Sequence, residues 1–187
     1  LAKTNMAMQK SIGRLSSGLR VSSAADDAAG LAVAENMRAQ HRGYQQAQRN
    51  ANDGISIVQT AEAAYQSISD TLIRMRELAV EASNDSLSSV ERGFLDTEFQ
   101  DLDAEITRIS NVTEFNGINL LDGTAGDAGA LVFQVGTRNS ANDVINVTLT
   151  SQSSSELAID DDAVTNLTTA NAAITAIYEA LESLNTD

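Results

Sequence analysis

A seven-residue alternation of apolar and polar positions runs through the first half of the chain. Between Val33 and Ala82 the apolar residues recur at steps of four and three, and only Gln40 and Gly54 interrupt the series. A heptad series of this length is typical of one long helix whose apolar stripe packs along other helices. At about 1.5 Å per residue, a helix over 31–83 is roughly 75 Å long, which predicts a rod and not a compact globule.

Three further segments complete the predicted architecture. A second helix is expected over 88–110 and must fold back on the first, because few residues link them. Two alternating runs within 111–150 predict a β-hairpin region, and a last helix is expected over 162–187. The predicted fold class is therefore mainly α, an elongated rod of three long helices with a small β-hairpin region between the second and the third. The apolar stripes of the later helices are Leu95, Phe99, Leu102, Ile106 and Ile109, then Leu167, Ala170, Ile174, Ile177, Leu181 and Leu184.

The first thirty residues are organised differently from this rod domain of residues 31–187. Residues 1–17 carry a helical pattern of their own. Residues 18–30 combine glycines, serines and paired aspartates, which predicts a hinge or linker bounded by Gly18 and Gly30. Ser and Asp residues in this linker are also typical of a helix start.

Composition and charge exclude several classes of protein. The chain has 187 residues and a formal net charge of −14, with no Cys and no Pro. The charge is uneven: residues 1–42 hold six basic and three acidic residues, whereas the chain from Ser110 onward holds eleven acidic residues and one base, Arg138. This asymmetry predicts attraction between one end of the chain and the other end of a neighbouring copy. Nucleic-acid binding and a membrane span are not expected.

No constellation of residues indicates catalysis, a cofactor or a metal. The only histidine, His41, lies between Gln40 and Arg42 in the predicted long helix, and the nucleotide-binding, hydrolase and metalloprotease motifs are absent. The triplet at 160–162 is all aspartate, but it lacks the alternating ligand spacing of a calcium loop and is expected to cap the last helix. The sequence therefore predicts a protein that is not an enzyme.

Four long segments, together with a fifth, resemble one family. RLSSGLRVSSAADDAAGLAVAENM (14–37), RNANDGISIVQTAE (49–62), LIRMRELAVEASN (72–84) and TEFNGINLLDG (113–123) closely resemble bacterial flagellin. FQVGTRNSANDVINVTL (133–149) looks like the hairpin segment of that family.

The resemblance implies a structural, self-assembling subunit of the bacterial flagellar filament that serves motility. It implies secretion by the flagellar type III apparatus and assembly with other flagellin subunits, an export chaperone and a cap protein. Residues 1–17 would then be a remnant of the helix that lines the filament core. Since the chain also stops before the family's final helix, the fragment is expected to polymerise poorly.

The resemblance also identifies candidate contact residues. Arg74, Leu78, Glu81 and Glu98 resemble a patch that the innate immune receptor Toll-like receptor 5 reads in many flagellins. Position 81 is often Gln in that family. The alternative for this patch is a lateral contact between protofilaments.

The predicted positive ends for rod-to-rod assembly are Arg14, Arg20, Arg38, Arg42 and Arg49, with the acidic C-terminal half as their complement. Two alternatives to a filament subunit are a hook–filament junction protein and a helical adaptor that binds one partner without polymerising.

Overall fold

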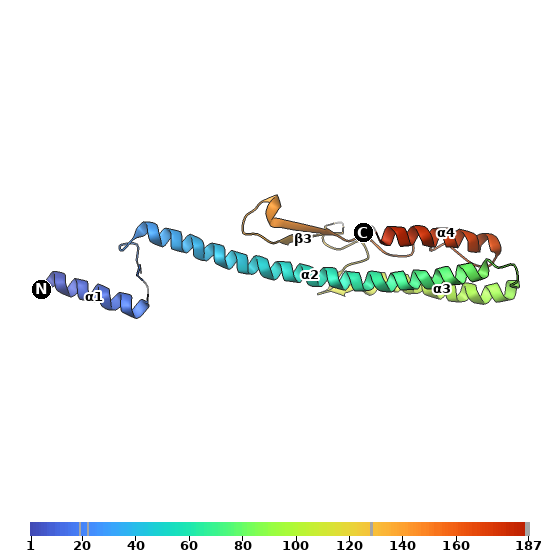
Figure 1. Cartoon of the computed structure of the whole chain (residues 1–187), viewed down its shortest axis with the longest axis horizontal. Coiled ribbons are helices and arrows are strands. Elements are labelled where there is room, and N and C mark those ends of the chain that lie inside the picture. Colours follow the sequence, from blue (N-terminus) through green and yellow to red (C-terminus); the bar gives the residue numbers. More distant parts are fainter. Residues whose placement is uncertain (19, 22, 128, 186–187) are drawn as a thin grey trace.

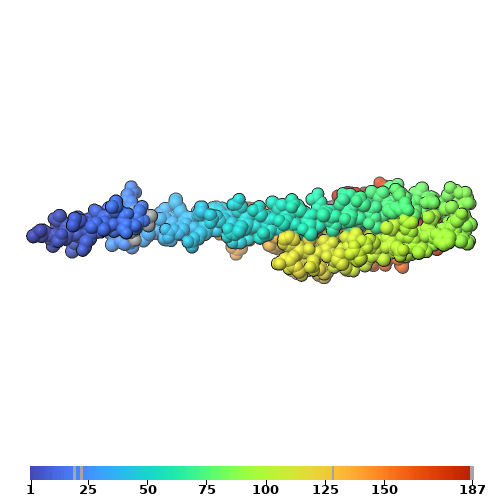
Figure 2. All heavy atoms as spheres, turned by 90° about the horizontal axis from the view of Figure 1, so that it is seen from below, coloured from blue at the N-terminus to red at the C-terminus, as the bar shows by residue number. Residues whose placement is uncertain are grey.

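The computed structural model describes residues 1–18, 20–21, 23–127 and 129–185, and these form a long, narrow rod (Figures 1 and 2). The rod is built on α2 (Ala28–Ala82), an uninterrupted helix of 55 residues. The predicted long helix is therefore confirmed. Its absence of proline and its heptad series both favour one continuous helix over several short ones.

The start of α2 corrects one boundary of the predicted hinge. Asp27 caps the helix, because its Oδ1 accepts a hydrogen bond from the backbone N–H of Gly30 at 2.9 Å. A Cβ at position 30 would lie only 2.4 Å from an Asp27 carboxylate oxygen, so the cap fits closely around a glycine. Gly30 thus belongs to the first turn of α2 and not to a linker.

A separate helix, α1 (Ala2–Ser17), precedes α2 and buries none of its residues. It ends at Gly18, which adopts a left-handed conformation with φ of 67° and donates its N–H to the Arg14 carbonyl at 2.9 Å. Leu19 and Ser22 of the predicted hinge lie outside the described residues. The linker contacts α1 through Asp26, which forms ion pairs with Lys10 and Arg14.

Two helices cover the second half of α2 and form a three-helix bundle (Figure 1). α3 (Ser89–Val112) folds back along α2, and α4 (Leu167–Leu184) lies against α2 as well. The predicted stripe of α3 is confirmed, with Phe99 and Ile106 wholly buried. On α4 the buried face is Ala170, Ala173, Ile177, Ala180 and Leu184, whereas Ile174 and Leu181 are only half-buried. Small alanines at this face allow α4 to approach α2 closely.

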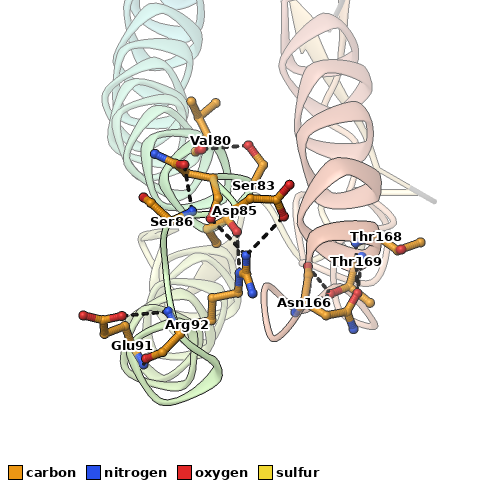
Figure 3. Close-up of polar contacts among 12 residues, drawn as sticks. Val80, Ser83, Asp85, Ser86, Glu91, Arg92, Asn166, Thr168 and Thr169 are labelled. Atoms are coloured by element: carbon orange, nitrogen blue, oxygen red, sulfur yellow. Dashed lines mark hydrogen bonds and ion pairs between the residues drawn. The ribbon is translucent and has the colours of Figure 1, made fainter.

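The α2–α3 turn and the start of α4 lie at the same end of the bundle, which Figure 3 shows in close-up. Ser88 and Glu91 form a capping box at the start of α3, in which the Glu91 N–H donates to the Ser88 hydroxyl and the Ser88 N–H donates to the Glu91 carboxylate. Hydrogen bonding from Ser88 lowers the pKa of the Glu91 carboxyl. Arg92 donates from Nε to the Ala82 carbonyl at 2.8 Å and from Nη2 to the Asn84 carbonyl at 2.9 Å. Arg92 therefore closes the end of α2.

The last helix starts later than the sequence predicted. Asn166 is its N-cap, since its side-chain oxygen accepts hydrogen bonds from the N–H groups of Thr168 and Thr169 (Figure 3). The aspartates at 160–162 do not cap it. They belong to an irregular segment over 151–166, here called the strap, which leads from the hairpin to α4 and buries Leu157, Ile159 and Val164.

The β structure consists of two small antiparallel hairpins. β1 (Glu114–Phe115) and β2 (Ile118–Asn119) are joined by Asn116 and Gly117, whose φ angles of 52° and 78° are those of a type I′ turn. β3 (Ala130–Gln134) pairs with β4 (Val144–Thr148), with Phe133 opposite Ile145, and the loop between them holds the short 3₁₀ helix η1 (Ala141–Asp143). The β3–β4 hairpin predicted from sequence is confirmed.

In the part of the chain that the structure describes, no helix is both long enough and apolar enough to cross a membrane.

Candidate interaction surfaces

The two halves of α2 differ in what covers their apolar stripe. In the bundle, Ile68, Leu72 and Met75 are wholly buried. In the first half the same heptad series is open to solvent: Met37 is 65% exposed and Tyr44 is 59% exposed. The expectation that the whole stripe packs against other helices is therefore wrong for residues 28–46, here called the bare half, where the rod narrows to a single helix (Figure 2).

Basic residues accompany this exposed stripe. Arg38, Arg42 and Arg49 lie exposed on α2; Arg38 pairs with Glu35 at 2.9 Å, and Arg49 donates to the side chain of Gln46 at 2.6 Å. Arg14 lies on α1 and Arg20 in the linker, so the structure places these two apart from the other three candidates.

The β3–β4 hairpin lies on α2 beside the bare half, and glycines make this contact close. A Cβ at Gly54 would lie 3.2 Å from the ring of Phe133, and a Cβ at Gly43 would lie 2.7 Å from the methyl group of Thr137. Between them, Asn50 donates from Nδ2 to the Gln134 carbonyl at 2.9 Å. Gly54, which interrupts the apolar series of α2, is thus the position where the hairpin approaches the helix closely.

An apolar pocket opens between α2 and this hairpin. Its volume is about 260 Å³, and its walls include Ile55 and Val58 from α2 and Val135, Ile145 and Val147 from the hairpin. Ile55 is 55% exposed and Ile145 is 50% exposed, so the hairpin covers its side of α2 incompletely.

The predicted receptor patch is brought together in part. Arg74 donates from Nε and Nη2 to Glu98 of α3 at 2.9 and 2.7 Å and from Nη1 to Glu77 at 3.0 Å, and these bonds raise the pKa of its guanidinium. Glu81 is exposed about two turns further along α2 from Arg74. The prediction that Leu78 is part of this exposed patch is corrected, because its side chain is wholly buried. Two helices cover α2 here, so its buried face is wider than a heptad stripe and includes Leu78.

No group of three or more His, Cys, Asp or Glu side chains is placed to hold a metal ion within residues 1–18, 20–21, 23–127 and 129–185. The features that the structure does offer are surfaces: an exposed apolar stripe, an open apolar pocket and charged patches on a rigid rod. Such surfaces define a protein that acts by packing against other macromolecules.

Comparison with known proteins agrees with this class. Residues 1–126 match the bacterial flagellin N-terminal helical region. The chain is 44% identical over 177 residues to a flagellin of Halalkalibacterium halodurans, covering 95% of this chain and 64% of that protein. It is 37% identical over 196 residues to the flagellar filament 33 kDa core protein of Treponema phagedenis, covering 99% of this chain and 68% of that protein.

A solved structure supports the same assignment. The crystal structure of Bacillus cereus flagellin superposes with a TM-score of 0.62 at 33% identity, covering 74% of this chain and 78% of that one. The chain belongs to the bacterial flagellin family. Its fold is the helical flagellin fold, and the family is a structural one and not a family of enzymes.

Proposed function

We propose that this chain is a structural subunit of the bacterial flagellar filament, in which identical rods lie side by side. The observation that carries the proposal is the unequal cover of one heptad series: the chain covers the stripe in the bundle and leaves it exposed over 28–46. An exposed stripe of this length on a rigid helix needs a partner, and identical copies supply one at every subunit. The relatives named as flagellin and as a flagellar filament core protein support the same conclusion.

Electron microscopy of the full-length protein after salt-induced assembly tests this proposal. Wild-type protein should give long filaments, and Met37→Glu should give none or short ones, because it places a charge on the exposed stripe. Met37 is 65% exposed, so the monomer should keep its stability. The matched control is Ala39→Glu, which adds the same charge to the bare half at an exposed position outside the heptad series.

Two outcomes would contradict the proposal that the chain is a filament subunit, and a third would contradict the role given to the bare half. Small rings in place of filaments would support a hook–filament junction protein, and a monomer that binds one other protein at fixed stoichiometry would support an adaptor. Normal filaments from Met37→Glu would show that the bare half has no part in assembly.

Family membership also supports finer proposals about where the protein acts and what it meets. We propose that it is secreted by the flagellar type III apparatus to the filament, with an export chaperone and a cap protein as partners on the way. These partners follow from the family resemblance of the sequence. The proposed contacts to acidic surfaces of neighbouring subunits are Arg14, Arg20, Arg38, Arg42 and Arg49.

We propose in addition that Arg74, Glu81 and Glu98 form a surface that Toll-like receptor 5 can bind in the monomer. All three side chains are exposed: Arg74 of α2 is paired with Glu98 of α3, and Glu81 lies about two turns further along α2. Arg74→Ala should weaken receptor signalling. The control, Arg108→Ala, removes an arginine that is also exposed but is paired with Glu105 on α3 alone, and it should leave signalling unchanged. Equal signalling by the two variants would rule out the patch.

A further inference from the structure

The strap over 151–166 is fastened to one polar stripe of α3. Asp96 accepts a hydrogen bond from the Val164 N–H at 2.8 Å, and Gln100 donates to the Asp162 carbonyl at 2.8 Å. Further along, Thr107 and Ser154 join their hydroxyl groups at 2.9 Å. Asp96, Gln100, Asp103 and Thr107 follow steps of four, three and four, so they lie on one face of the helix.

Two carboxylates along this contact have a buried oxygen without a donor. Oδ1 of Asp103 on α3 and Oδ2 of Asp162 on the strap are both closed off from solvent, and neither has a hydrogen-bond partner in the described structure. Buried oxygens of this kind are rare and are normally satisfied by a donor. A proton on either carboxyl group would create a donor at this place.

The charges that act on this pair are all negative. Asp160 acts on Asp103, and Asp103, Asp160 and Asp161 act on Asp162, while α2 and α4 add no charge that affects either group. Among the described residues, no Lys or Arg forms an ion pair with Asp103 or with the three aspartates at 160–162. Burial first, and then repulsion from Asp103, Asp160 and Asp161, raises the pKa of Asp162. Burial also raises the pKa of Asp103, and repulsion from Asp160 adds to this, although a hydrogen bond from Ser154 acts in the opposite direction.

We propose that Asp103 and Asp162 form a proton-operated latch, which holds the strap on α3 when one of the two is protonated and loosens it when both are ionised. Because the pKa values are raised by folding, the folded latch binds protons that the open strap releases. The stability of the closed strap therefore decreases as pH rises through the raised pKa values. It is recovered as pH falls toward about 4, the ordinary range of an aspartate.

Hydrogen exchange of the strap amides measures the latch directly. In wild-type protein, with EDTA present and intrinsic exchange rates divided out, protection over 151–164 should fall as pH rises from acid to neutral. The expected change is about tenfold for each unit by which folding raises the pKa. Asp103→Asn and Asp162→Asn place a neutral donor at the latch, so their protection should be high and independent of pH.

Asp101→Asn is the matched control, because Asp101 is an exposed acid on the same helix, outside the stripe that contacts the strap. It should keep the wild-type pH profile. Should Asp103→Asn fail to fold, Asp160→Asn removes repulsion without altering either buried oxygen and should raise protection at neutral pH. A flat profile in the wild type, or a profile that Asp101→Asn abolishes as fully as the latch variants do, would overturn the proposal.

Discussion

The bundle half and the bare half of α2 follow one sequence rule and reach opposite states. Both halves repeat apolar residues at steps of four and three, yet Met75 is wholly buried while Met37 is 65% exposed. The difference is the presence of α3 and α4, which lie only along the second half. A heptad series thus predicts that a helix packs against a partner. Whether that partner comes from the same chain depends on the other elements of the fold.

The largest expected effect comes from removing the same side chain in each half. Met75→Ala should lower the free energy of unfolding by about 2–5 kcal/mol, because it opens a cavity in the bundle core. Met37→Ala should change it by less than about 0.5 kcal/mol, as expected for an exposed side chain. Urea denaturation of the two variants measures both values, and equal losses would show that the bare half is covered in the monomer.

The next effect concerns the closed end of the bundle. Arg92→Ala should lower the free energy of unfolding by about 1–3 kcal/mol, because the Ala82 and Asn84 carbonyls lose a charged donor. Arg92→Lys should recover less than half of this loss, since a single ammonium group does not reproduce two donors in a fixed fork. Arg108→Ala serves as the control, and a loss there as large as that of Arg92→Ala would refute the role assigned to these two carbonyls.

The long helices could be predicted from sequence because their apolar spacing is strong and uninterrupted. The same spacing overlooked Leu78, whose burial depends on two helices covering α2 from different sides. It also assigned the start of α4 to the aspartate triplet, although Asn166 with Thr169 makes the capping box, four residues after Asp162. Local patterns define an element, but its exact start depends on which of several capable residues the tertiary packing selects.

The surfaces were predicted less completely, for a physical reason of the same kind. The uneven charge and the basic residues could be read from the chain, but the apolar pocket beside Phe133 joins α2 to a hairpin far away in sequence. The contact between α3 and the strap, in which Asp96 accepts from Val164 and Gln100 donates to Asp162, is likewise a meeting of distant segments. Contacts of high sequence separation leave no periodic signal, so the structure was needed to find them.

The hairpin is the only β element beside the bare half in the described chain, which permits a third and smaller test. Gly54→Leu should displace Phe133 and speed amide exchange in β3, while Gly93→Leu, with open space around its Cβ, should leave the hairpin protected. In both variants, replacing a helical glycine by a better helix former should raise the free energy of unfolding by about 1 kcal/mol. Only in Gly54→Leu does the new side chain crowd the Phe133 ring, and the cost of this crowding should be larger than the gain in helix stability. The free energy of unfolding of Gly54→Leu should therefore fall by about 1 kcal/mol overall. Equal exchange in β3 of both variants would mean that the hairpin does not rest on Gly54.

The smallest expected effect is on the surface of the bundle half, at the ion pair between Arg74 and Glu98. Both side chains are nearly half exposed, at 47% and 46%, so solvent and salt screen their attraction. A double-mutant cycle with Arg74→Ala and Glu98→Ala should therefore give a coupling within the error of urea denaturation at physiological salt. A coupling as large as the effect of Arg92→Ala would mean that this pair supports the fold. If the coupling is negligible, substitutions at Arg74 leave the fold intact. Any loss of binding that they cause then reflects a lost contact with a partner molecule and not a destabilised rod, and the same holds for substitutions at Met37 in the bare half.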